Sequence, residues 1–83
     1  MARFFFDTSI GESHMRDAEG LEYADVARAC RDARQSLVAL VAEALGDDAD
    51  HITPHHCAVT VRDSSGQVTA RFFADLGEDI SPA

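Results

Sequence analysis

The pattern of apolar positions predicts one long amphipathic helix, from about Asp25 to Leu45, between two segments with strand-like patterns. At about 100° per residue, one side of this helix is almost entirely apolar. That apolar side consists of Val26, Ala29, Cys30, Ala33, Leu37, Leu40, Val41 and Ala44. Asp25 is suited to the N-cap, and Gly46 is suited to the position that ends a helix. The helix is therefore expected to pack this side against a second layer.

Alternation of apolar and polar residues predicts a β-hairpin near the end of the chain. Residues 57–62 and 67–73 alternate, and the segment Asp63-Ser64-Ser65-Gly66 between them is rich in turn formers. The side-chain period of two puts the apolar residues of both strands on one face. The expected register sets Val61 opposite Val68 and Val59 opposite Ala70.

The first residues predict a second hairpin. Phe4 and Phe6 would point to one face of a strand and Phe5 to the other, and residues 13–16 would return beside them. The order is then β-β-α-β-β, which indicates an α+β fold: a four-stranded antiparallel sheet with the long helix packed on one face.

The chain of 83 residues has room for one hydrophobic core. We expect residues 1–76 to form a single α+β domain and residues 77–83 to form a flexible C-terminal tail.

One face of such a sheet has no helix to cover it, and the alternation puts Phe5 and Phe73 there. Clustered apolar surface on a small domain is typical of an interface, so we predict that both rings lie at a homodimer or partner contact. Val38 and Leu45 widen the apolar side of the helix beyond what a narrow sheet needs. They are predicted to take part in a contact as well.

The net charge of −8 comes from 15 acidic and 7 basic residues, and every basic residue is arginine. This charge disfavours direct nucleic-acid binding and is compatible with a basic protein partner. No apolar run is long enough to span a bilayer, and the first residues do not have a signal-peptide pattern. A cytoplasmic location is therefore expected.

Four segments stand out when the chain is read as a whole. They are the opening Arg3-Phe4-Phe5-Phe6-Asp7, the turn Arg16-Asp17-Ala18-Glu19-Gly20-Leu21-Glu22, Asp25 before an alanine- and arginine-rich helix, and Val61-Arg62-Asp63 with Gly66-Gln67-Val68. Together these segments resemble a family of short uncharacterised bacterial proteins, domain of unknown function 6894. The resemblance covers most of residues 2–76. Ala24 stands where such relatives often have proline, and the loop from Asp47 to His56 is longer and richer in histidine. The resemblance implies no activity, so no catalytic residue is carried over.

The strongest candidate for chemistry is the loop 47–57, which contains three aspartates, Cys57 and the histidines His51, His55 and His56. These side chains are of the kinds that bind zinc or nickel. However, Pro54 prevents a helix that would align the histidines, and their spacing matches no established ligand motif. A solvated connection is favoured over a metal site. The cysteines Cys30 and Cys57 are expected to be buried, reduced thiols.

A second acidic group consists of Asp17, Glu19, Glu22 and Asp25. Structural roles suffice for it, because Asp17 can close a turn, Gly20 can adopt a positive φ angle and Asp25 can cap the helix. No nucleophile with an adjacent base and no glycine-rich phosphate loop is present, so we assign no catalytic residue and no cofactor. The sequence favours a non-enzymatic module that self-associates or binds a partner. The alternative is metal binding or metal-dependent catalysis in the loop 47–57.

Overall fold

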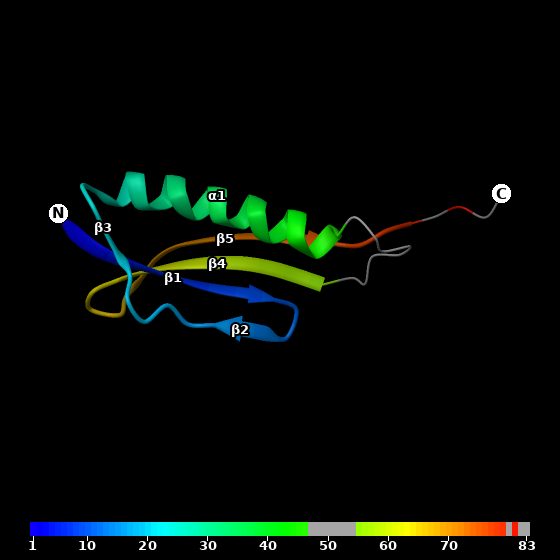
Figure 1. Ribbon diagram of the computed structural model, residues 1–83, viewed down its shortest axis with the longest axis horizontal. Coiled ribbons are helices and arrows are strands. Elements are labelled where there is room, and N and C mark those ends of the chain that lie inside the picture. The colour runs from blue at the N-terminus through cyan, green and yellow to red at the C-terminus, as the bar shows by residue number, and fades with distance from the viewer. Residues whose placement is uncertain (47–54, 80, 82–83) are drawn as a thin grey trace.

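The computed structural model describes residues 1–46, 55–79 and 81 of the chain. It contains one helix and an antiparallel sheet (Figure 1). The elements are β1 (Ala2–Ile10), β2 (Ser13–Met15), β3 (Leu21–Tyr23), α1 (Val26–Leu45), β4 (His55–Asp63) and β5 (Val68–Leu76). The strand order is β2-β1-β4-β5, and β3 also pairs with β1. Helix α1 lies along one face of the sheet.

The predicted α+β architecture is confirmed, including the antiparallel path of four strands. The structure adds the short strand β3, which the sequence pattern had not indicated. β2 pairs only with the end of β1, from Thr8 to Ile10, and β3 pairs with its beginning, from Ala2 to Phe4. The two short strands therefore share one edge of β1, with a gap between them.

The helix begins and ends where the sequence predicts. The Asp25 side chain accepts a hydrogen bond from the Arg28 backbone N–H at 2.9 Å, as an N-cap does. At the other end Gly46 has a φ angle of 56° and donates its N–H to the Ala42 carbonyl. These contacts satisfy backbone groups that a helix leaves unpaired at its ends.

The core lies between α1 and the central strands. Ala29 and Ala33 are fully buried, so the small side chains let the helix backbone come close to the sheet. Opposite them lie Phe4, Val59 and Val61. The apolar side predicted for the helix thus faces the sheet, although Val26 at its start is exposed and its other members, apart from Ala29 and Ala33, are only partly buried.

Tyr23 closes the end of the core beside the start of the helix. Its ring lies 6.2 Å from the ring of Phe4 and 5.8 Å from that of Phe6, measured between centroids. Its hydroxyl donates a hydrogen bond to Asp32 on α1 at 3.0 Å. Burial, together with the Asp32 carboxylate, raises the pKa of Tyr23 to about 12. The short strand β3 is therefore tied to both layers.

The predicted register of the β4–β5 hairpin is wrong by two residues. The Asp63 N–H donates to the Gln67 carbonyl, so the loop contains three residues rather than two. A second irregularity, at Val61 and Arg62, adds one more residue to β5. The observed pairs are Val61 with Ala70 and Val59 with Phe72. Because the two single-residue shifts add up to an even number, Ala70 and Phe72 still face the helix as predicted.

Within the described ranges, no helix is long and apolar enough to cross a membrane. Of the tail expected over residues 77–83, Ile80, Pro82 and Ala83 lie outside the described residues.

Close packing of α1 on the sheet predicts that a larger side chain at position 33 is not tolerated. We expect Ala33→Leu to lower the free energy of unfolding by about 1–3 kcal/mol, since extra methylene groups in a filled core force strain. Ala39→Leu, on the exposed side of the same helix, is the matched control and should change it by less than about 0.5 kcal/mol. Urea denaturation measures both, and equal losses would contradict this packing.

Candidate functional site

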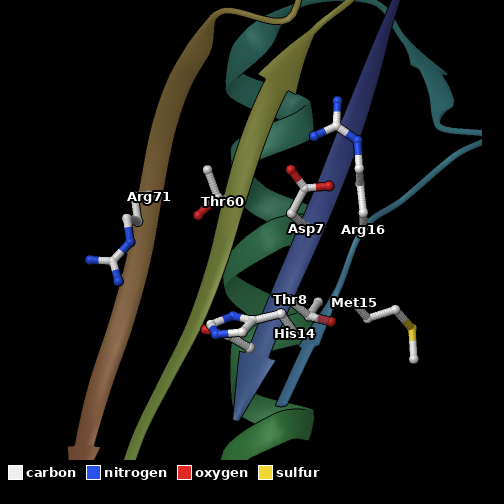
Figure 2. Close-up of a pocket in the computed structure, with 8 residues that line it drawn as sticks. Asp7, Thr8, His14, Met15, Arg16, Thr60 and Arg71 are labelled. Atoms are coloured by element: carbon white, nitrogen blue, oxygen red, sulfur yellow. The ribbon is translucent and has the colours of Figure 1, made fainter. Parts of the chain in front are cut away.

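The sheet face opposite α1 carries most of the charged side chains of the long strands. Register and alternation place a single set of residues on this open face. The set consists of Phe5, Asp7 and Ser9 from β1, His56, Ala58, Thr60 and Arg62 from β4, and Arg71, Phe73 and Asp75 from β5. Figure 2 views part of this face with the helix behind the sheet. The face is thus polar, with one aromatic ring near each end.

Arg62 and Asp7 form a clamp between β4 and β1. The Arg62 Nε lies 2.5 Å from Asp7 Oδ2, and its Nη2 donates to Asp7 Oδ1 at 3.1 Å. The two side chains are only 11% and 24% exposed. The guanidinium lowers the pKa of Asp7 against the opposing effect of burial, and the Asp7 carboxylate raises the pKa of Arg62. The pair is therefore a fixed ion pair across neighbouring strands.

Asp17 connects this clamp to the turn after β2. Its carbonyl accepts a hydrogen bond from Arg62 Nη2 at 2.9 Å, and its backbone N–H donates to Asp7 Oδ1 at 3.0 Å. Its side-chain Oδ2 accepts the Phe6 backbone N–H at 3.0 Å. The Asp17 carboxylate thereby occupies the gap that β2 and β3 leave on the edge of β1.

The other Asp17 carboxylate oxygen shapes the turn. It accepts the backbone N–H groups of Glu19 at 3.2 Å and of Gly20 at 3.1 Å. Burial alone would raise the pKa of Asp17, but the hydrogen bonds from Phe6, Gly20 and Glu19 lower it overall. The structural role predicted for this aspartate in closing the turn is confirmed, and it is larger than the sequence indicates.

Phe5 lies beneath these groups and is half-buried. The Arg62 guanidinium lies 4.9 Å from its ring centroid. On another side is Gly20, whose φ angle is 67°, and a β-carbon there would lie 2.9 Å from the Phe5 ring and 2.7 Å from the Phe4 carbonyl oxygen. The Phe5 ring, which the sequence predicts at an interface, thus already contacts groups of its own chain. Its role in an intermolecular contact stays a prediction.

A second cluster surrounds Phe73 near the other end of the open face. His56 Nδ1 lies 2.5 Å from Asp75 Oδ1, and Arg71 Nη2 lies 3.0 Å from His56 Nε2. A neutral imidazole with its hydrogen on Nδ1 satisfies both contacts. The His56 ring stacks on Phe73 with centroids 5.5 Å apart, and the Arg71 guanidinium lies 5.4 Å from the Phe73 centroid. Phe73 nevertheless remains 57% exposed.

Between the two clusters the open face has a shallow hollow of about 320 Å³. It is lined by Asp7, Thr8, Ser9, His14, Met15, Arg16, Thr60 and Arg71. Arg71 extends away from it on one side, whereas on the other side the Arg16 guanidinium is directed toward the Asp7 carboxylate (Figure 2). Their guanidinium groups therefore do not converge on one bound anion.

The other predicted contact residues, Val38 and Leu45, lie on the helix layer. Val38 is 63% exposed and Leu45 is 39% exposed. The four residues predicted for an interface thus divide between the open face and α1. Their part in an interface stays a prediction.

The predicted metal ligands are not brought together in the part of the chain that can be described. His51 lies outside it, His55 is known only as the first backbone position of β4, and His56 contacts Asp75 and Arg71. Cys57 is fully buried, and burial raises the pKa of its thiol. Among residues 1–46, 55–79 and 81, no three His, Cys, Asp or Glu side chains could hold a metal ion. The metal hypothesis stays a prediction.

Both cysteines are free thiols. Cys57 is buried as predicted, whereas Cys30 is only partly buried.

Sequence reasoning missed the residues that build the two clusters, above all Asp7, Arg62 and the pair Arg71 and Asp75. In the sequence each of these residues is a charged position that alternates with apolar positions along a strand. Such a position is ordinarily explained by exposure to solvent, so it does not by itself indicate a site. Asp7, Asp17 and Arg62 also lie within the segments that carry the family resemblance. The pairing of β1 with β4 brings Asp7 and Arg62 together.

These features define a class of small α+β domain, in which one helix crosses an antiparallel sheet and an arginine–carboxylate clamp joins the central strands to a turn. The chain belongs to the family described as a domain of unknown function, DUF6894, whose model matches residues 3–75. No curated protein and no solved structure matches the chain. The matched segment contains every residue of the clamp and of the Phe73 cluster.

The lowered pKa values of Asp7 and Asp17 predict a loss of stability in acid. Their contribution to stability is fully present well above 3.8, the ordinary pKa, and is lost as the pH falls through the lower folded-state values. We expect the urea midpoint to fall between pH 5 and about pH 2. Asp7→Asn should be less stable at neutral pH and show a shallower dependence on pH. Glu43→Gln, on the exposed side of α1, is the control, and a variant Asp7→Asn that keeps the wild-type profile would contradict the clamp.

The position of Gly20 predicts a severe effect of adding one methyl group. We expect Gly66→Ala to cost about 1–2 kcal/mol from its positive φ angle alone, because a β-carbon there meets open space. Gly20→Ala has the same conformational strain and also the contact with Phe4 and Phe5. It should therefore cost about 1–3 kcal/mol more. Thermal unfolding compares the two variants, and equal losses would show that the turn has room for the methyl group.

Proposed function

We propose that this domain is a non-catalytic cytoplasmic binding module that self-associates through the part of its open face around Phe73. The observation that supports this most strongly is the exposure of the Phe73 ring on β5. On the same face its neighbours along the strand are Arg71 and Asp75, and both contact His56. Aromatic residues and arginine are enriched where protein interfaces carry most of their binding energy. A rigid strand also presents the ring at little cost in conformational entropy.

The charges of the open face favour a second copy of the chain over a basic partner. Asp7 is neutralised by Arg62, and Asp75 is paired with His56 beside Arg71. This face therefore lacks the excess of negative charge that the whole chain has. A basic protein partner is supported by the net charge alone and would bind elsewhere.

The same pairing argues against a catalytic role for these carboxylates. A general base needs a pKa near the working pH, whereas Arg62 lowers the pKa of Asp7 below its ordinary value. A carboxylate held by two guanidinium contacts is a structural group. Binding through shape and an aromatic anchor is the function that this surface supports best.

The test is to measure molecular mass by light scattering for the wild type and for Phe73→Asp. We expect the wild type to exceed the monomer mass of 9.0 kDa and Phe73→Asp to weaken self-association at least about 100-fold, as loss of a central aromatic anchor does. The matched control is Leu21→Asp, since Leu21 is 62% exposed and lies on β3, beyond β1 from Phe73. It should leave the mass unchanged.

A wild type that remains monomeric at concentrations near 1 mM would overturn the proposal. So would equal dissociation of the Phe73→Asp and Leu21→Asp variants, because the contact would then not be specific to the face around Phe73.

A further inference from the structure

We infer that self-association joins the edge strands β5 of two copies into one continuous antiparallel sheet, with Phe73 opposite Phe73 across a twofold axis. The inference rests on the proposed function and specifies its partner and register. β5 ends the path β2-β1-β4-β5 and is nine residues long. In the described part of the chain no strand pairs with its outer edge. Such an edge offers a row of backbone groups to another strand.

The backbone phase of β5 determines which residues can form that pairing. The Gly11 N–H donates to the His56 carbonyl at 2.8 Å, so the backbone groups of His56 point toward β1. His56 is opposite Asp75, whose backbone groups must then point away from β4. By alternation the same holds for Phe73 and Arg71. These three residues thus present both their backbone groups at the free edge and their side chains on the open face.

The order of these three side chains is self-complementary. A twofold axis at Phe73 places Arg71 of each copy opposite Asp75 of the other, which gives two opposite-charge pairs around two facing rings. An axis at Arg71 or at Asp75 would instead set like charges against each other, which destabilises a strand pair. Axes at the residues between them place Phe73 opposite a charged residue and lose the charge pairs. The register centred on Phe73 is therefore favoured.

Groups for these new contacts are present on each side. Asp75 uses one carboxylate oxygen for His56, and Arg71 uses one of its N–H groups for the same ring. Their remaining donors and acceptors can reach across the seam. On the opposite face of the sheet the register sets Phe72 against Ala74, a large side chain against a small one.

The helix layer extends the same seam. The Arg34 guanidinium lies 5.7 Å from the centroid of Phe72 on β5, so this side of α1 is turned toward the free edge. Val38 and Leu45 follow one turn and three turns later on that side. A typical stable interface buries about 800 Å² of each partner, which is more than the edges of two strands alone provide. The exposed side chains of Val38 and Leu45 would add apolar area where the two helices lie side by side.

The decisive test is a charge exchange between two chains. In this register Arg71→Asp sets carboxylates opposite each other, and Asp75→Arg does the same with guanidinium groups, so each variant alone should self-associate at least about 10-fold more weakly than wild type. Mixed together, each introduced charge meets its opposite on the other chain. Sedimentation of the mixture should show a heterodimer with a dissociation constant within about 3-fold of the wild-type value.

The matched controls are Arg28→Asp and Glu43→Arg, which change the net charge equally on the flank of α1 away from β5. Mixing them should produce no preference for the heterodimer. If the wild type self-associates and Phe73→Asp dissociates it, yet the Arg71→Asp and Asp75→Arg chains do not combine, the register is wrong and the proposed function stands. A monomeric wild type overturns both.

A second measurement keeps the inference testable if either charge variant fails to fold. Hydrogen-bonded residues of an antiparallel pair have Cα atoms about 5.5 Å apart, a distance that a disulfide can span. A mixture of Arg71→Cys and Asp75→Cys should therefore form a cross-linked heterodimer under mild oxidation, whereas neither variant alone should. Cross-linking of each variant to itself with equal yield would contradict the register.

Discussion

The ion pair between Arg62 and Asp7 is the contact on which the arrangement of the sheet edge depends. One guanidinium binds the carboxylate of β1, the carbonyl of Asp17 in the turn and the face of the Phe5 ring. β2 and β3 contain only three residues each, so neither can hold the edge of β1 by backbone pairing alone. The Asp17 carboxylate replaces the missing pairing, and Arg62 fixes its position. Loss of Arg62 or Asp7 leaves the other member of the ion pair charged and poorly solvated, which costs more than the contact itself contributes.

This clamp also divides the open face into two parts with different surroundings. Near Phe5 the aromatic ring, the charges and the turn satisfy one another within the chain. Near Phe73 the polar side chains also contact one another, but they lie on β5, the last strand of the described sheet, and Phe73 remains exposed. Two aromatic residues that the sequence pattern treats alike thus differ in what surrounds them. The difference arises from position in the sheet, because β1 pairs with strands on both sides, whereas among the described strands β5 pairs only with β4.

Local patterns predicted the features that depend on near neighbours in the sequence. The helix with its cap at Asp25, the turn at Gly20 and the helix-facing side of each strand follow from period and residue type. The hairpin register did not follow, since one extra loop residue and one bulge leave the alternation intact. The clamp could not be predicted either, because Asp7 and Arg62 are 55 residues apart and meet only after β1 pairs with β4.

An exposed edge strand normally endangers a small protein, because any other strand can pair with it. β5 has neither proline nor lysine to prevent this. It carries Arg71 and Asp75 instead, on either side of Phe73, and in the proposed pairing this order would discriminate between partners. Displacing an identical strand so that the axis falls on either charged residue sets like charges opposite each other, and an unrelated strand has no reason to carry the complementary pattern. A symmetric contact needs only one strand to encode both halves of the interface, so in the proposed dimer three alternate residues would both protect the edge and select its partner.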